Sequence, residues 1–343
     1  MRLGLVGFGV GGRYFHAPFI RAADGVELVG VVTRSEGRRA DLAVDHPGVP
    51  AYDSFEELIA AGVDAVTITT PPATRRALVL AAVAAGVSVI ADKPFAPTAD
   101  AGRELAAAAE AAGVVVNVFH NRRWDADVRT LAALLARGEL GRLIRVESRF
   151  DLDDPATLDA GPTGGLLRDL GSHLVDQALW LLGPARQVRA DLEWIELAEG
   201  PTDAGFTLVI THTSGVRSHL SSTKCNRIQQ REWRVYGSAG GYRASGTDVQ
   251  AQAVFAGLRP VDLGPAWGYE DKPHWGTLTT AAGAVRVPSE RGAYQDYYSQ
   301  FASAWRGEAD FPVPVAQAIQ TLEVLDAARV SASEGRTVSL TPS

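Results

Sequence analysis

The sequence predicts an α/β protein: a parallel sheet covered by helices on both faces, followed by an α+β domain with a large, mostly antiparallel open sheet. Two observations carry this prediction. Over residues 1–119, short apolar runs alternate with helical patterns, and runs without internal alternation are typical of strands buried on both faces. From about residue 188, strand patterns follow one another without intervening helices, which favours antiparallel pairing.

The first domain, residues 1–119, contains the apolar runs that we expect to be strands: Leu3–Val6, Val26–Val32, Ala65–Thr69, Val87–Ala91 and Val114–Phe119. Between them lie helical patterns, one of which begins at Ser54 and Glu57 with the spacing of a capping box. Thr98 precedes an alanine-rich helix that we expect to end near Gly113. We place the domain boundary near His120.

The second domain, residues 120–343, has a different order of elements. A helix is expected around Asp125–Ala136, a half-buried strand at Leu143–Asp151 and, after a Gly/Pro-rich loop at 154–165, a helix that ends at Leu182. Strand candidates follow at Val188–Glu196, Phe206–Thr213, Arg217–Ser222 and Glu232–Tyr236, an irregular segment at 248–275, and two helices near Ala293–Trp305 and Val315–Ser333. The exposed face of this sheet would be a large apolar surface unless covered, so we expect a homodimer or homotetramer through it, an expectation that rests partly on the family resemblance given below.

Composition excludes several classes of protein. The 343 residues, 46% hydrophobic and 21% charged, suit about two globular domains. The net charge of −7 argues against a nucleic-acid-binding protein. No apolar run approaches the roughly 18 residues of a membrane span, and the single Cys225 fits a reducing compartment, so we expect a cytoplasmic protein away from membranes. The histidines show no metal-ligand spacing, and we expect no metal site.

A glycine-rich segment follows the first apolar run. Gly7-Phe8-Gly9-Val10-Gly11-Gly12 matches G-x-G-x-x-G, where Gly7 permits the tight turn, Gly9 the approach of a pyrophosphate and Gly12 the packing of the helix on the sheet. With Phe8 and Val10, these glycines are our candidate dinucleotide site in a Rossmann domain. The alternative is a tight glycine turn without a ligand.

The end of the second run indicates which dinucleotide binds. An acidic residue usually stands there and bonds the ribose 2′-hydroxyl of NAD. This chain has Thr33-Arg34-Ser35, with Arg38 one helical turn later, and a guanidinium can pair with a 2′-phosphate. We therefore expect NADP rather than NAD. A solvated arginine face beside Glu36 is the alternative.

Two further segments carry candidate catalytic side chains. Asp92-Lys93-Pro94 follows the Val87–Ala91 run, so the Lys93 ammonium can stabilise a developing alkoxide at the carboxyl end of a strand. Asp169 and His173 lie four residues apart and Asp176 three further on, which places them on one side of a helix. Histidine has the intrinsic pKa to accept a proton near neutrality. A surface lysine and a helix-surface ion pair are the alternatives.

These motifs, in this order, resemble the glucose–fructose oxidoreductase/inositol dehydrogenase/rhizopine catabolism (Gfo/Idh/MocA) family over essentially the whole chain. The resemblance is closest to the branch of NADP-dependent scyllo-inositol dehydrogenases. The segments that carry this closer resemblance are Phe15-His-Ala-Pro18, His120-Asn-Arg-Arg-Trp-Asp125, Asp169–Gln177 and Gly292–Tyr298. In two places the chain departs from the family pattern: Asp92 stands where the family usually has Glu, and Arg75 where it commonly has His.

The resemblance implies a role for each matched residue. Lys93 would be the catalytic lysine, Asp169 its acidic partner and His173 the proton acceptor. These three would also contact the substrate, whose hydroxyls Asp176 would bind. The positions implied near the cofactor are Thr70, Pro71, Asp92, Lys93, Asn121 and Arg123.

We expect a reversible NADP-dependent dehydrogenase acting on a secondary alcohol of a cyclic polyol or sugar. Two alternatives stay open: a non-catalytic dinucleotide-sensing regulator, and cofactor-assisted glycoside cleavage or imine reduction at the same site. His16 carries no assigned role. Trp267 and Trp275 form either a wall for a sugar ring or a plug beneath the sheet.

Overall fold

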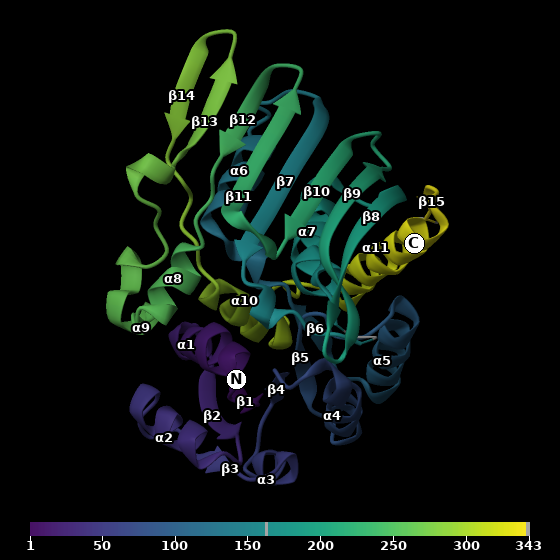
Figure 1. Ribbon diagram of the computed structural model, residues 1–343. Helices are drawn as coiled ribbons and strands as arrows, with labels where there is room; N and C mark the ends of the chain where they lie inside the picture. Colours follow the sequence, from purple (N-terminus) through teal and green to yellow (C-terminus); the bar gives the residue numbers. More distant parts are fainter. Residues whose placement is uncertain (162–163, 341–343) are drawn as a thin grey trace.

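The computed structural model describes residues 1–161 and 164–340 and contains two sheets (Figure 1). The first sheet is six-stranded and parallel, in the order β3-β2-β1-β4-β5-β6. Its strands are β1 (Arg2–Val6), β2 (Glu27–Val32), β3 (Ala51–Tyr52), β4 (Ala65–Ile68), β5 (Ser88–Asp92) and β6 (Val116–Phe119). This order confirms the predicted Rossmann fold and puts a crevice between the carboxyl ends of β1 and β4, where the order reverses.

Helices connect these strands. A π-helical turn (Gly11–His16) leads into α1 (Ala17–Ala22), and the other connections contain α2 (Glu36–Asp45), α3 (Phe55–Ala60), α4 (Pro72–Ala84) and α5 (Ala99–Ala112). Ser54 and Thr98 cap α3 and α5 as predicted, each accepting a hydrogen bond from the backbone N–H three residues later. Gly113 ends α5 in the left-handed conformation at φ 66°, which a glycine adopts without strain.

The second sheet has nine strands in the order β14-β13-β12-β11-β7-β10-β9-β8-β15, of which only the β7–β10 pair is parallel. The strands are β7 (Leu143–Asp153), β8 (Ala185–Leu197), β9 (Gly200–His212), β10 (Arg217–Thr223), β11 (Cys225–Gly237), β12 (Gly240–Ala244), β13 (Gly276–Thr280), β14 (Gly283–Val287) and β15 (Val338–Ser339). The predicted mostly antiparallel sheet is therefore confirmed.

Helices cover one face of this sheet. The helices of this part of the chain are α6 (Ala126–Ala136), α7 (Leu166–Leu182), α8 (Val249–Phe255), α9 (Pro260–Leu263), α10 (Gln295–Trp305) and α11 (Val315–Glu334). In Figure 1, α7 and α11 lie behind β8, β9 and β10. The predicted irregular segment 248–275 is partly wrong, because it contains α8 and α9. The predicted loop 154–165 includes residues 162–163, which lie outside the described residues.

The opposite face of the large sheet is charged, so the expectation of an apolar exposed face is wrong. Along β7, the outward positions alternate with buried Val146, Ser148 and Phe150. Outward-facing Arg145 pairs with Glu147 on the same strand at 2.9 Å, and Arg234 pairs with Glu232 on β11 at 3.0 Å. Ion pairs and hydroxyl groups therefore make this face polar.

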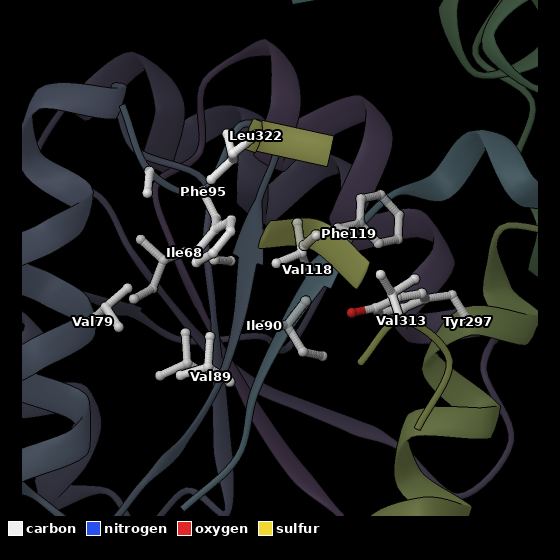
Figure 2. Packing of buried hydrophobic residues seen from close by; sticks show 14 of the residues in the cluster. Ile68, Val79, Val89, Ile90, Phe95, Val118, Phe119, Tyr297, Val313 and Leu322 are labelled. Atoms are coloured by element: carbon white, nitrogen blue, oxygen red, sulfur yellow. The ribbon is translucent and has the colours of Figure 1, made fainter. Parts of the chain in front are cut away.

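One hydrophobic cluster joins the parallel sheet to the C-terminal helices. Figure 2 shows Phe95 and Phe119 of the first half beside Leu322, Val313 and Tyr297 from the end of the chain. Gly102 on α5 allows α11 to approach, because a Cβ there would lie 3.2 Å from Leu322. The division into domains 1–119 and 120–343 stays a prediction.

None of the helices in the described ranges has both the length and the apolar character that a membrane span needs.

Candidate active site

The glycine-rich turn lies at the crevice between β1 and β4. Gly7 has φ 102°, which strains residues with a side chain. A Cβ on Gly12 would lie 2.2 Å from the Gly7 carbonyl oxygen, so only glycine lets the following helix pack this closely. A Cβ on Gly9 would meet nothing nearer than Arg38 at 4.0 Å. The turn therefore presents open backbone at Gly9, while Phe8 is buried and Val10 is exposed.

The end of β2 presents cationic side chains to solvent. Thr33 is buried, whereas Arg34, Ser35 and Arg38 are exposed. The Ser35 hydroxyl caps α2 by accepting from the Arg38 backbone N–H at 3.4 Å. Arg34 donates through Nε to the Asp53 carbonyl at 3.0 Å. The guanidiniums and the N-terminus of α2 together form a positive surface beside the crevice.

Lys93 and Asp169 form an ion pair between the two halves of the chain. Lys93 follows β5 and lies 76 residues from Asp169 on α7. Its Nζ donates to Asp169 Oδ1 at 2.8 Å and to the Asp169 carbonyl at 3.0 Å. An ammonium group has three N–H donors, so one is left for a ligand. The predicted pairing of these two residues is thus present.

A second lysine, Lys224, binds the other oxygen of the same carboxylate. It stands between β10 and β11, is 5% exposed, and donates to Asp169 Oδ2 at 2.8 Å and to Thr157 Oγ1 at 2.9 Å. Burial would raise the pKa of Asp169, but the two ammonium groups hold it below its usual range. The sequence analysis missed Lys224, because a lone lysine after a strand pattern carries no signal of burial.

His173 lies one helical turn after Asp169 on α7. Its side chain is 6% exposed, and its Nδ1 has no hydrogen-bond partner among the described residues. Burial and the positive charges of Lys93 and Arg122 lower the pKa of His173 well below its ordinary value. The imidazole is therefore neutral near pH 7 and can accept a proton.

Arg75 ties together the backbone on both sides of Lys93. It is 6% exposed and donates through Nε to the Thr70 carbonyl at 2.9 Å, and through Nη1 to the Asp92 and Pro94 carbonyls at 3.0 and 2.6 Å. Arg75 thus links the strand end that carries Thr70 and Pro71 to the strand end that carries Lys93.

Asp92 is held beside the glycine-rich turn. Its Oδ1 accepts from the Lys93 backbone N–H at 2.8 Å, and its Oδ2 lies 3.6 Å from His16 Nε2. Burial would raise the pKa of Asp92, but His16, Arg75 and Lys93 hold it below its usual range. His16, whose Nδ1 lies 2.5 Å from the Tyr298 hydroxyl, therefore connects this carboxylate to α10.

Asp176 is engaged within the protein. Arg123 donates to its two oxygens at 2.9 and 2.6 Å, and both side chains are almost fully buried. Arg123 also donates to Gln317 on α11 at 2.7 Å. Asn121, close by in a short 3₁₀ turn, is buried. The structure thus gives Asp176 a protein partner, and its contact with substrate hydroxyls stays a prediction.

We expect Asp176→Ala to lower the free energy of unfolding by about 3–5 kcal/mol, because it leaves the buried Arg123 guanidinium without its carboxylate. Denaturant unfolding monitored by tryptophan fluorescence measures this change. The matched control is Glu104→Ala, which removes the half-exposed partner of Arg76 and should cost about 1 kcal/mol or less. A stable Asp176→Ala protein with a raised KM would instead make Asp176 a substrate contact.

The Trp267 side chain lies in the protein interior. This side chain is 1% exposed, packs edge-on against Phe19 and donates to Gln250 at 3.1 Å. Burial excludes Trp267 as a wall for a ligand, and its contacts are with α1 and α8 rather than beneath the sheet. Trp275 donates to the Glu270 carbonyl at 3.2 Å. No cluster of three metal-ligating side chains occurs in the described ranges.

The crevice fits a dinucleotide. The open backbone at Gly9 leaves room for the pyrophosphate of a dinucleotide. The cations at the end of β2 suit the adenosine half of the same molecule. Lys93 and Thr70 follow neighbouring strands at the same sheet edge, where a nicotinamide would lie. We therefore take the Gly7–Gly12 turn as the pyrophosphate-binding element.

Comparisons with known proteins match both parts of the chain to one family. Residues 1–120 match the oxidoreductase family with an NAD-binding Rossmann fold, and residues 128–243 match the GFO/IDH/MocA C-terminal domain. The uncharacterized oxidoreductase YdgJ of Escherichia coli (strain K12) is 35% identical, with 99% of each chain covered. The scyllo-inositol 2-dehydrogenase (NADP(+)) IolW of Bacillus subtilis (strain 168) is 28% identical over 99% of this chain and 96% of its own.

A solved structure matches the whole fold as well. The oxidoreductase yvaA from Bacillus subtilis superposes with a TM-score of 0.90 at 29% identity, covering 99% of this chain and 98% of its own. The family models match two segments of the chain, and YdgJ is more than 30% identical over nearly its full length. The chain therefore belongs to the Gfo/Idh/MocA family of oxidoreductases.

Proposed function

We propose that this oxidoreductase is a reversible NADP-dependent dehydrogenase acting on a secondary alcohol of a cyclic polyol or sugar, including inositol-like substrates. The observation that carries the proposal is the Lys93 ammonium held on Asp169 one helical turn from a buried, neutral His173. A cation and a neutral base side by side suit the removal of a hydroxyl proton. The similarity to the NADP-dependent IolW supports the substrate class.

His173 and Lys93 act on the same substrate hydroxyl group. His173 accepts the hydroxyl proton, and the free N–H of Lys93 stabilises the negative charge that develops on the same oxygen. Asp169 holds Lys93 in place, and Arg75 fixes the backbone around it. A nicotinamide held in the crevice would supply the acceptor for a hydride from the carbinol carbon. Thr70, Pro71, Asp92, Asn121 and Arg123 would line its side of the crevice.

The test is a screen of purified protein for NADP reduction across inositols, aldoses and their lactones. We expect reduction with at least one class of polyol. NADP binding without turnover on any alcohol would favour a dinucleotide-sensing regulator instead.

We also propose a preference for NADP, because Arg34 stands where a ribose-binding acid is expected. Arg34→Asp should weaken NADP binding roughly 10- to 100-fold, the effect of losing a charged hydrogen bond, and improve NAD. Titration with NADP and with NAD measures the two affinities. The matched control is Arg76→Asp, which changes an exposed arginine on α4. Equal kcat/KM for both cofactors, unchanged by Arg34→Asp, would contradict the assignment.

Assembly and location complete the proposal. We place a homodimer or homotetramer interface on the outward sheet face, where alternating Arg145 and Glu147 can pair with a second copy across a two-fold axis. Sedimentation equilibrium should give a multiple of the chain mass, and a monomer at every concentration would contradict it. The proposed setting is the cytoplasm, without a nucleic-acid or membrane partner.

A further inference from the structure

Lys224 is a buried lysine to which the proposed mechanism gives no part. It stands between β10 and β11 and is almost fully buried. Its backbone N–H donates to the Ala204 carbonyl at 3.0 Å, and its carbonyl accepts from the Asp154 N–H at 3.1 Å. The register between β11 and β7 shifts after Cys225, and such irregularities redirect side chains next to active sites. The fold therefore gives the Lys224 side chain a fixed direction.

The Lys224 and Lys93 ammonium groups share one carboxylate. Lys93 Nζ donates to Asp169 Oδ1 and Lys224 Nζ donates to Asp169 Oδ2, each at 2.8 Å. Lys224 Nζ also donates to Thr157 Oγ1 at 2.9 Å, which fixes the second ammonium further. A carboxylate has two acceptor oxygens, so turning both of them toward Lys93 would break the bond to Lys224. Lys224 therefore sets the orientation in which Asp169 holds Lys93.

The charges of this group do not cancel. Two ammonium groups share the single carboxylate of Asp169. Asp92, the other carboxylate beside Lys93, is matched by Arg75, whose Nη2 lies 3.7 Å from Asp92 Oδ2. These described side chains therefore carry one excess positive charge, and burying a charge without a partner lowers the stability of a fold. A role in stability alone does not account for Lys224, whereas a negative charge that forms during the reaction would.

We propose that Lys224 is a positioning residue of the dehydrogenase that acts through Asp169: it takes one oxygen of the carboxylate, so that Lys93 keeps the charge and the N–H that stabilise the developing alkoxide. This inference rests on the proposed function, because an alkoxide develops only if the chain oxidises an alcohol. Without Lys224, Asp169 would neutralise Lys93 alone, and the transition state would lose part of its electrostatic stabilisation. Ground-state binding would stay the same, because Lys224 acts on Asp169 rather than on a ligand.

Lys224→Met should lower kcat by about 10- to 100-fold, less than Lys93→Met, and leave the KM of the alcohol and the Kd of NADP nearly unchanged. Steady-state kinetics with the best alcohol of the screen and a cofactor titration on one preparation measure these values. A raised KM at normal kcat would make Lys224 a substrate contact and overturn the positioning role. The matched control is Lys272→Met, which removes an exposed lysine outside the site and should behave as the unaltered protein does.

Two further substitutions separate charge from packing. Lys224→Arg keeps the charge and should retain more of kcat than Lys224→Gln, which keeps an N–H donor without the charge. Equal rates in these two variants would overturn the role, and both serve if Lys224→Met does not fold. In single-turnover stopped flow, the rate constant of NADP reduction in Lys224→Gln should fall while its amplitude stays. A lower amplitude at a normal rate constant would mark a loss of folded protein and would also overturn the role.

A double substitution tests the route through Asp169. In Asp169→Asn the shared negative charge is gone, so adding Lys224→Met should change kcat by less than about threefold. Two independent effects would instead multiply, and the double variant would be slower than Asp169→Asn by the full factor that Lys224→Met causes alone. That result would overturn the positioning role.

The failure of this inference and the failure of the proposed function give different results. No NADP reduction in the unaltered protein would contradict the dehydrogenase, and the role of Lys224 would fall with it. Reduction at the normal rate in Lys224→Met and Lys224→Gln would leave the dehydrogenase standing and overturn the role of Lys224 alone.

Discussion

Lys93→Met is expected to lower kcat by about 10²–10³-fold, the usual cost of removing one donor to a developing oxyanion. Its ammonium is fixed on Asp169 at 2.8 Å and has one N–H free, so methionine removes the donor while keeping a similar volume. Cofactor binding should change little, because the Gly7–Gly12 turn proposed to hold the pyrophosphate is a separate part of the crevice. Steady-state kinetics and a cofactor titration on one preparation measure both effects.

The chain offers a matched control for this change. Lys272 lies 6.0 Å over the Trp275 ring, is exposed and is outside the site, so Lys272→Met should behave as the unaltered protein does. A Lys93→Met protein that is folded, binds NADP and turns over at the normal rate would show that Lys93 is only a surface charge with a structural partner.

His173→Ala is expected to lower kcat by roughly 10²–10⁴-fold, the usual contribution of a positioned acid–base group. A protonated imidazole cannot accept a proton, so the rate falls as pH drops through the pKa of His173. Since burial and Lys93 lower that pKa, the acidic limb of kcat/KM should lie below about 6.5, the ordinary imidazole value. In His173→Ala this limb should vanish, whereas the residual activity of Lys93→Met should keep it, moved to higher pH because the charge of Lys93 no longer lowers the pKa of His173.

The control for the histidine is His274→Ala, since His274 is exposed and its loss should leave rate and pH profile unchanged. Near-normal hydride transfer in a folded, NADP-binding His173→Ala protein would remove His173 from the mechanism. Lys93 or a bound water would then be the base.

The sequence predicted the strands whose apolar runs are continuous, because burial on both faces leaves that pattern in β1, β2, β4, β5 and β6. It missed β3 and β15, which have two residues each, and also β12, β13 and β14, of which β14 is mostly exposed. Such strands are held by pairing with neighbours, and their own residues carry little periodic signal. The same limit explains why α8 and α9 were not distinguished within a Gly- and Pro-rich segment.

In the candidate site too, local patterns could be predicted from the sequence and long-range contacts could not. The glycine-rich turn, Lys93 and the Asp169–His173 spacing could be predicted because each is a local pattern. Lys224 could not, because it meets Asp169 only through the fold, 55 residues away in sequence. The polar character of the outward sheet face could not be predicted, because alternation in a strand does not say which face meets the helices.

Single-turnover stopped flow tests the central claim most directly. The protein is loaded with NADP and mixed with the best alcohol from the screen, and with the same alcohol deuterated at the reacting carbon, while nicotinamide absorbance is followed. We predict reduction of the bound cofactor in one phase that deuterium slows and that Lys93→Met and His173→Ala nearly abolish. Cofactor that binds but is not reduced, or reduction at the normal rate in both variants, would contradict the account.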